Sequence, residues 1–218
     1  MDGHERDGGD TDAGDGRPSG EHRSQASGPT RGYGGRSRAE LEAARDRTLP
    51  HLMADGLGVV FCGMNPGLTT ALVGHHFASP GNRFWPALAH AGFTPETFTP
   101  DRERELLPLG MGLTNLVERA TRDISELSRE DLEAGGERLR AEMERYRPAW
   151  LAFLGLTGFR TAFGVKGASV GPRAERIGPT RVWLLPNPSG RNAHWKPPEL
   201  AQEYARLREA AGLPDRSA

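Results

Sequence analysis

The residue of this chain best placed to do chemistry is Asn65, an amide that follows directly on an apolar run. Residues 59–63 (VVFCG) form the run, and Pro66 and Gly67 would turn the chain sharply after the amide. In an open α/β sheet, reactive groups gather where strands end at their carboxyl edge. An amide is a poor general base, so it would act by hydrogen bonding. The sequence therefore predicts that Asn65 is presented in a cleft.

A second segment of the same design lies far downstream. The apolar residues 182–185 (VWLL) run into residues 186–194 (PNPSGRNAH), which are polar and rich in turn formers. Two loops that each follow a buried strand are expected at the same edge of a parallel sheet. We therefore expect both loops to border one cleft.

The elements that must position these loops alternate between strands and helices along the chain. We expect strands at 58–63, 112–117, 150–154 and 182–185. We expect helices at 37–47, 83–91, 129–147, 157–163 and 199–211. Residues 69–82 are small, aromatic or imidazole in type, and favour a binding loop over a helix. This alternation predicts a three-layer α/β/α fold with a mainly parallel central sheet.

Length and composition predict one folded domain with tails. The chain has 218 residues, a length that suits one α/β domain. Residues 1–36 are rich in Gly, Asp, Arg and Ser, so they cannot bury enough apolar surface to offset the entropy lost on ordering. We expect a disordered tail over residues 1–36, a single domain over residues 37–213 and a short C-terminal tail over residues 214–218.

Charge and cysteine content exclude several kinds of site. The formal net charge is −1 at pH 7, so net charge points to no partner, although DNA binding needs only a local basic patch. Cys62 is the only cysteine, which excludes disulfides within a monomer, zinc–cysteine clusters and cysteine-ligated iron–sulfur sites. The histidines show no ligand spacing on a recognisable helix. We expect neither a metal nor another cofactor.

The chain also lacks the marks of a membrane or secreted protein. No stretch approaches the roughly 20 apolar residues of a membrane helix, and the N-terminus has no apolar signal region. We expect a soluble, monomeric, cytoplasmic protein that would be associated with the nucleoid in a bacterium.

Four segments, in order along the chain, carry a family resemblance. They are residues 63–68 (GMNPGL), residues 74–85 with GHHF and PGNRFW, residues 113–121 (LTNLVERAT) and residues 185–190 (LPNPSG). Together they resemble the motifs of the uracil-DNA glycosylase superfamily, and specifically its mismatch-specific uracil and thymine DNA glycosylase branch. The first motif alone would be a weak signal, but four segments in family order are a strong one. The resemblance extends from about residue 58 to the last helix.

The resemblance implies a monofunctional DNA glycosylase acting on double-stranded DNA. Such an enzyme flips uracil, or thymine, out of a mispair with guanine and hydrolyses the bond between base and sugar, which initiates base excision repair. Asn65 would position the attacking water, and Phe77 would stack on the extruded base. Backbone N–H groups of the first loop would stabilise the departing base. The resemblance adds as base-pocket residues Met64, Gly67, Thr70, His76 and Asn115.

By the same resemblance, the second loop faces the duplex. Arg191 would fill the gap left by the flipped nucleotide, while Gly190 approaches the orphaned guanine. Asn187 and Ser189 would bind the DNA backbone beside the lesion. The residues assigned to this task are Asn187, Pro188, Ser189, Gly190, Arg191 and Asn192.

Three residues depart from the bacterial pattern of the branch. Arg191 stands where bacterial members carry an apolar wedge, typically Leu, and is similar to the thymine-processing animal members. Asn115 also matches the animal branch, where the bacterial one has Lys. Thr70 replaces a Ser or Ala, and its extra methyl is expected to crowd the methyl of thymine, so uracil should be preferred. Since Asn65 lacks the carboxylate that some relatives have, we expect modest turnover.

The residue types leave other interpretations open. Asn65 could be a turn residue bonded to its own loop, Phe77 a core residue, His76 a solvated histidine, Arg191 a surface arginine and Asn115 a strand-end cap. A noncatalytic module that holds a mispaired or damaged base is the main alternative function. A nucleotide hydrolase or other phosphate-handling α/β protein is disfavoured, because the chain lacks GxxxxGK[ST] and GxGxxG motifs.

Overall fold

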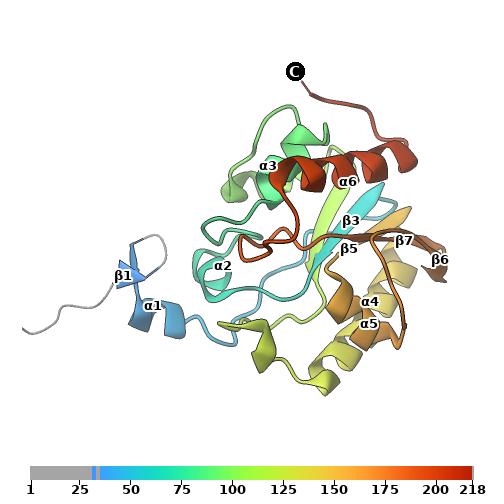
Figure 1. The fold of residues 1–218 in the computed structure, drawn as a ribbon. Helices are drawn as coiled ribbons and strands as arrows, with labels where there is room; N and C mark the ends of the chain where they lie inside the picture. Colours follow the sequence, from blue (N-terminus) through green and yellow to red (C-terminus); the bar gives the residue numbers. More distant parts are fainter. Residues whose placement is uncertain (1–30, 33–34, 218) are drawn as a thin grey trace, which may run out of the picture.

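A five-stranded sheet forms the centre of the computed structural model, which describes residues 31–32 and 35–217 (Figure 1). The strand order is β4-β3-β5-β7-β6, with β6 antiparallel to β7 and the other neighbours parallel. The strands are β3 (Val59–Gly63), β4 (Met111–Asn115), β5 (Trp150–Leu154), β6 (Gly171–Ile177) and β7 (Thr180–Leu185).

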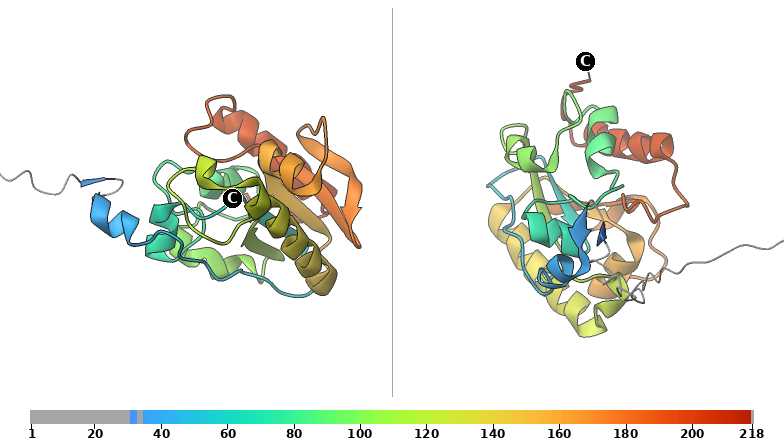
Figure 2. Two further views of the ribbon diagram at one scale, coloured as in Figure 1. Left: turned by 90° about the horizontal axis from the view of Figure 1, so that it is seen from below. Right: turned by 90° about the vertical axis from the view of Figure 1, so that its left-hand side faces the viewer.

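Two pairs of helices cover the sheet. Helices α3 (Phe84–His90) and α6 (Pro197–Ala210) lie on one face, and α4 (Arg129–Tyr146) and α5 (Leu156–Phe163) lie on the other (Figures 1 and 2). The predicted three-layer fold with a mainly parallel sheet is therefore confirmed.

The interior strand β3 is apolar on both faces because helices cover both. Val59 and Phe61 pack with α3 and α6, whereas Val60 and Cys62 pack with α4 and α5. All four side chains are fully buried, as the side-chain alternation of a covered parallel strand requires. Burial also raises the pKa of the Cys62 thiol, so this cysteine is a neutral core residue.

The strand ends bring the two predicted loops together. Gly63 at the end of β3 pairs with Asn115 at the end of β4, and Leu154 pairs with Leu185 across β5 and β7. Because these strands are parallel and in register, the segments that follow them leave from one edge of the sheet. The loops that begin at residues 64 and 186 therefore start at the same edge.

Local sequence signals set several helix ends as predicted. Ser128 caps α4 by accepting a hydrogen bond from the backbone of Asp131, whose side chain accepts one from the backbone of Ser128 in return. Pro197 opens α6, where its missing N–H has no intrahelical acceptor to lose.

The expectation that residues 69–82 form a loop without a helix is wrong at its start. Helix α2 (Leu68–Val73) occupies that stretch, between Gly67 at its N-cap and Gly74, which adopts a left-handed conformation at its C-cap. Two threonines give the segment low helix propensity. Tertiary packing overrides propensity here, because Leu68 and Ala71 lie buried against the segment around Leu41.

Strand β6 was not predicted, because its sequence is mostly polar. Buried and exposed side chains do not alternate regularly along this strand. Arg173 and Glu175 form an ion pair with each other on the exposed edge. Charged side chains of this kind are common on edge strands, where they discourage pairing with other chains.

The remaining elements are short. The predicted helix 37–47 is regular only over α1 (Arg38–Glu42), which is capped by Ser37. The prediction of a disordered tail over 1–36 lies mostly outside the described residues. Of that range, β1 (Arg31–Gly32) pairs with β2 (Arg36–Ser37). Two short 3₁₀ helices complete the set, η1 (Pro100–Leu106) and η2 (Ile124–Glu126).

Candidate active site

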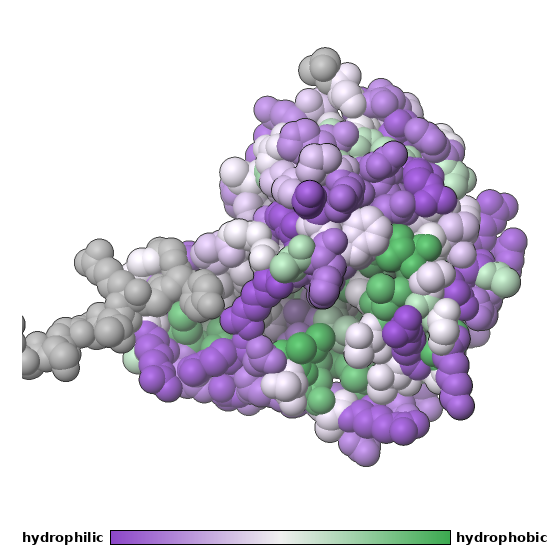
Figure 3. All heavy atoms as spheres, in the orientation of Figure 1, coloured by the Kyte–Doolittle hydropathy of each residue, from purple (hydrophilic) through white to green (hydrophobic). Residues whose placement is uncertain are grey.

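A cavity of about 790 Å³ opens at the carboxyl edge of the sheet. This volume lies within the usual range for small-molecule sites. The face drawn in Figure 3 is hollowed near its middle, with hydrophilic side chains along the rim and hydrophobic residues beside them. Every predicted site residue except His76 lines the cavity. Those that line it are Met64, Asn65, Gly67, Thr70, Phe77, Asn115, Asn187, Pro188, Ser189, Gly190, Arg191 and Asn192.

The hydrogen bonds of Asn65 fix which way its amide points. Its Nδ2 lies 3.2 Å from the carbonyl oxygens of both Pro66 and Arg119, and 2.8 Å from Oγ1 of Thr121. The two carbonyls can only accept, so the nitrogen must face them. The half-buried side chain therefore keeps Oδ1 as its remaining acceptor, on a residue that borders the cavity.

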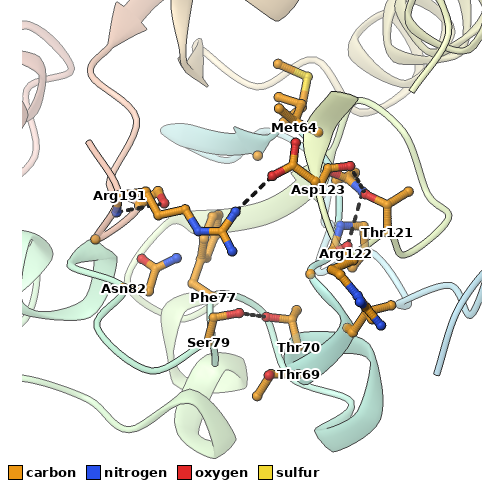
Figure 4. Close-up of a pocket in the computed structure, with 18 of the residues that line it drawn as sticks. Met64, Thr69, Thr70, Phe77, Ser79, Asn82, Thr121, Arg122, Asp123 and Arg191 are labelled. Carbon is orange, nitrogen blue, oxygen red and sulfur yellow. Dashed lines mark hydrogen bonds and ion pairs between the residues drawn. The ribbon is translucent and has the colours of Figure 1, made fainter. Parts of the chain in front are cut away.

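Thr121 links this amide to the opposite wall. Its hydroxyl accepts from Asn65 and donates to the carbonyl oxygen of Asp123 at 2.9 Å. The carboxylate of Asp123 in turn accepts from Nη1 of Arg191 at 2.9 Å (Figure 4). Hydrogen bonds from Ser125, and then the nearby Arg191 guanidinium, lower the pKa of Asp123, so its carboxyl group is ionised at neutral pH. An ion pair thus joins the loop after β7 to the segment after β4.

Phe77 is held in a strained position on the cavity wall. Its backbone is left-handed, with φ at +55°, which is rare for an aromatic residue and costs conformational energy. Its ring stacks on Phe84 of α3 with centroids 4.0 Å apart, and its Cε1 atom would lie 3.3 Å from a Cβ added at Gly63. Phe77 is thus both a core-packed side chain and a cavity-lining residue, and its stacking on a base stays a prediction.

His76 does not lie where the sequence analysis placed it. The side chain is 1% exposed and lies behind the cavity wall instead of lining it. Its backbone N–H donates to Glu103 at 2.7 Å, and its carbonyl accepts from Trp85. The prediction that His76 is a base-pocket residue is therefore corrected, as is the alternative of a solvated histidine. The side chain turns inward because these two anchors fix the backbone of the turn.

The buried histidine instead sets the orientation of Asn115. Its Nε2 lies 3.0 Å from the carbonyl oxygen of Pro50, which can only accept, so Nε2 carries the proton. Burial lowers the pKa of His76, which keeps the ring neutral and leaves Nδ1 as an acceptor. Nδ2 of Asn115 lies 3.4 Å from that Nδ1, so its Oδ1 faces away from His76, on the side of Gly63.

Another part of the cavity wall carries a pair of hydroxyl groups. The Oγ1 atom of Thr70, on α2, lies 3.3 Å from the Oγ atom of Ser79 (Figure 4). Thr70 is 5% exposed and Ser79 is half-buried. The hydrogen bond holds the threonine side chain in one rotamer, which fixes where its methyl group stands.

The second loop is braced by its own side chains. Oδ1 of Asn187 accepts from the backbone of Ser189, and Nδ2 of Asn192 donates to the carbonyl of Asn187. The hydroxyl of Ser189 accepts from the backbone of Arg191 at 3.3 Å. In this structure, the predicted DNA-contact side chains of Asn187 and Ser189 therefore serve the loop itself. The side chain of Arg191 is 65% exposed.

Several lining residues were missed by sequence reasoning. Asp123 and Thr121 come to the cavity because the chain after β4 turns back across the sheet edge, and no local pattern announces that path. Arg38 and Leu41 reach it from α1, outside the segments that carry the family resemblance. Thr121 ends the segment 113–121 that carries the family resemblance, and the sequence signal beside Asp123 is the capping box that opens η2.

The described residues contain neither a metal-binding cluster of side chains nor a membrane-spanning helix. In residues 31–32 and 35–217, no group of three or more His, Cys, Asp or Glu side chains is arranged to hold a metal ion. Within the same ranges, no helix is long and apolar enough to cross a bilayer.

Comparison with known protein families agrees with this geometry. The model of the uracil DNA glycosylase superfamily matches residues 50–208, which include the whole central sheet and both strand-end loops. The match covers well over half of the chain and contains nearly all of the cavity lining. The chain belongs to the uracil DNA glycosylase superfamily and is thus, in general terms, a DNA glycosylase of DNA repair.

Proposed function

We propose that this glycosylase excises uracil from G·U mispairs in double-stranded DNA, with thymine in G·T mispairs as a poorer substrate, and so initiates base excision repair. One observation carries the proposal. Asn65 and Arg191, from loops more than a hundred residues apart, border one cavity and are joined across it through Thr121 and Asp123. A water-positioning amide and a duplex-facing cation on opposite walls suit a flipped nucleotide between them.

The chemistry follows from the orientation of Asn65. Its Oδ1 can accept a hydrogen bond from one water and so aim the oxygen at C1′ of the sugar. Attack forms the C1′–O bond as the bond from C1′ to N1 of uracil breaks, and the electron pair leaves with the base. The proton of the water passes to solvent, because an amide cannot hold it. We assign the stabilisation of the departing oxygen to backbone N–H groups of the loop after β3.

Asn115 offers a basis for base selection. Its buried Oδ1 is an acceptor fixed by His76, and uracil and thymine both carry an N3–H donor, whereas cytosine carries a lone pair there. A buried acceptor rejects a base that cannot pair with it, because both groups would lose their hydrogen bonds to water. The pocket we propose therefore admits uracil and excludes cytosine.

Thr70 supports the preference for uracil over thymine. Its hydroxyl is bonded to Ser79, so its methyl group cannot easily rotate away from a ligand on that wall. A buried side chain with a fixed rotamer crowds an added methyl group and lowers the rate of excision of thymine.

A panel of substrates tests this specificity. At enzyme excess, we expect excision of uracil opposite guanine to be at least about tenfold faster than excision of uracil opposite adenine, because a mispaired base costs less to extract. Thymine opposite guanine should be slower than uracil opposite guanine, and Thr70→Ala should narrow that difference. Equal rates opposite guanine and adenine would exclude a mismatch-specific enzyme while leaving its family unchanged.

Replacing Arg191 tests the proposed wedge. We expect Arg191→Ala to slow excision from the G·U duplex by about tenfold, since the gap left by the base is then unfilled. Excision from single-stranded DNA should be unaffected, and Arg191→Leu should retain more duplex activity than Arg191→Ala. Arg206→Ala, an exposed arginine of α6 paired with Glu203, is the matched control. Equal losses on both substrates would contradict the wedge role.

A further inference from the structure

We propose that Arg83 is a positioning residue for the second strand-end loop, residues 186–194, which we call the DNA-facing loop. Arg83 holds this loop in the shape needed to enter the duplex. This inference rests on the proposed function, but it concerns a residue that belongs to neither strand-end loop. Arg83 stands at the N-cap of α3, and its own guanidinium does not line the cavity. What it contacts is the second loop, from behind.

The guanidinium of Arg83 donates to three carbonyl groups, two in that loop and one in the residue that follows it. Nη1 donates to the carbonyl of Trp195 at 2.6 Å, and Nη2 donates to those of Ser189 and Asn192 at 2.9 and 2.8 Å. These carbonyls are spread over seven residues of irregular chain. A charged planar donor that bonds several carbonyls at once fixes their relative positions more strongly than one neutral hydrogen bond could.

The backbone at Arg83 and just before it meets the same loop. The N–H of Arg83 donates to the carbonyl of Pro188 at 2.9 Å. Gly190 approaches Gly81 so closely that a Cβ on Gly190 would lie 2.6 Å from the carbonyl oxygen of Gly81. The turn before α3 and the loop after β7 are therefore packed backbone against backbone, and this contact requires a glycine at position 190.

We call the contacts of Arg83 and Gly81 with this loop the clamp, and the clamp rests on buried core residues. Phe84 and Trp85, which directly follow Arg83, are 0% and 4% exposed in the core beneath α3. Phe84 also carries the ring of Phe77, so the clamp and the stacking wall of the cavity share one support. Arg83 thus ties the DNA-facing loop to the same core that supports Phe77, the residue proposed to stack on the base.

For Arg191 to act as the wedge, the loop that carries it should already be ordered before DNA binds. An irregular loop loses conformational entropy when it is fixed in a DNA gap, and a loop that is already fixed in the free protein avoids that loss on binding. Arg191 lies between Ser189 and Asn192, the two residues whose carbonyls share Nη2 of Arg83. We therefore assign Arg83 the task of presenting Arg191 in a defined place.

Limited proteolysis measures the order of the loop without any reference to catalysis. Trypsin can cut after Arg191, whereas Lys196 precedes a proline and resists cleavage. We expect the Arg83→Met variant to be cut between Arg191 and Asn192 at least tenfold faster than the unmodified protein. Arg83→Lys, which keeps the charge but loses the planar fork, should be intermediate. An unchanged rate of cutting at Arg191 would overturn the proposal.

Excision assays measure what that order is for. At enzyme excess, Arg83→Met should slow excision from the G·U duplex by at least tenfold and excision from single-stranded DNA by less than threefold. A general loss of stability would reduce both rates together, so an equal loss on the two substrates would also overturn the proposal. Gly190→Ala provides a second route to the same result, because it separates the two backbones without removing the charge.

Arg208 supplies the matched control. It is 8% exposed and donates to the carbonyls of Ala91 and Leu213 and to the carboxylate of Asp215, so it too is a buried arginine that holds chain segments in place. It does not line the cavity. Arg208→Met should lower the melting temperature but leave both the cutting at Arg191 and the ratio of the two excision rates unchanged. If the unmodified protein released no base at all, the proposed function would fail, while proteolysis would still test the clamp.

Discussion

Replacing Asn65 with alanine is expected to slow uracil excision from a G·U duplex by at least about 100-fold, which corresponds to about 2.7 kcal/mol of transition-state stabilisation. The variant loses the fixed Oδ1 acceptor that we assign to the attacking water. It keeps the pocket walls and the DNA-facing loop, so its affinity for the duplex should change little. Single-turnover kinetics and fluorescence anisotropy, with a duplex that carries a non-hydrolysable uridine analogue, separate the two quantities.

The structural role of Asn65 needs its own control. Its Nδ2 also supports the carbonyls of Pro66 and Arg119, so the substitution removes hydrogen bonds that hold the loop. Thr121→Val removes another of the bonds to Nδ2 and leaves Asn65 in place. This variant should lose excision much less than Asn65→Ala does. If Asn65→Ala released uracil at the unmodified rate, Asn65 would have no part in the reaction.

Replacing Gly63 with alanine should have an effect of similar size through a different cause. A Cβ at this position would lie 2.7 Å from Oδ1 of Asn115 and 3.3 Å from Cε1 of Phe77. It would therefore intrude between the acceptor proposed to recognise the base and the ring proposed to stack on it. We expect excision of uracil to fall by at least about 100-fold, because a base that cannot seat in the pocket cannot reach the attacking water.

Gly136 is the matched control for this crowding. A Cβ there would lie 2.7 Å from the carbonyl oxygen of Ala162, so it meets a comparable obstacle at the contact between α4 and α5, remote from the cavity. Both substitutions should lower the melting temperature. At a temperature well below either transition, only Gly63→Ala should lose excision relative to the amount of folded protein. Near-normal excision by Gly63→Ala would place the base elsewhere in the cavity.

The parts of the fold that the sequence predicted well are those in which local pattern and tertiary environment agree. Trp150–Leu154 is wholly apolar and became a strand covered on both faces, and the Ser128 cap marked the start of α4. The prediction of a loop where α2 lies was wrong, because packing against Leu41 and Ala44 outweighs the low helix propensity of the threonines in α2. Edge strand β6 was not predicted because it carries charged residues where a core strand would have apolar ones.

The candidate site was predictable in its location more than in its contacts. The parallel sheet dictates that residues after β3 and β7 meet at one edge, so Asn65 and Arg191 could be assigned to one cleft from the sequence. Nothing local reveals that Asp123 reaches across to Arg191, or that Arg83 gathers the carbonyls of the second loop. The burial of His76 depends on Glu103 and Trp85, which lie elsewhere in the chain. The chemical roles of these residues stay predictions.

The central claim is that this cavity cuts the bond between uracil and its sugar in a G·U duplex. The most direct measurement incubates the full chain, in molar excess and with a metal chelator present, with a duplex that contains one uracil opposite guanine. Free uracil is then quantified by mass spectrometry. The account predicts one uracil released per duplex, with an abasic site left in the strand. A protein that binds the mispaired duplex yet releases no base would contradict the account and identify a noncatalytic mispair-binding module.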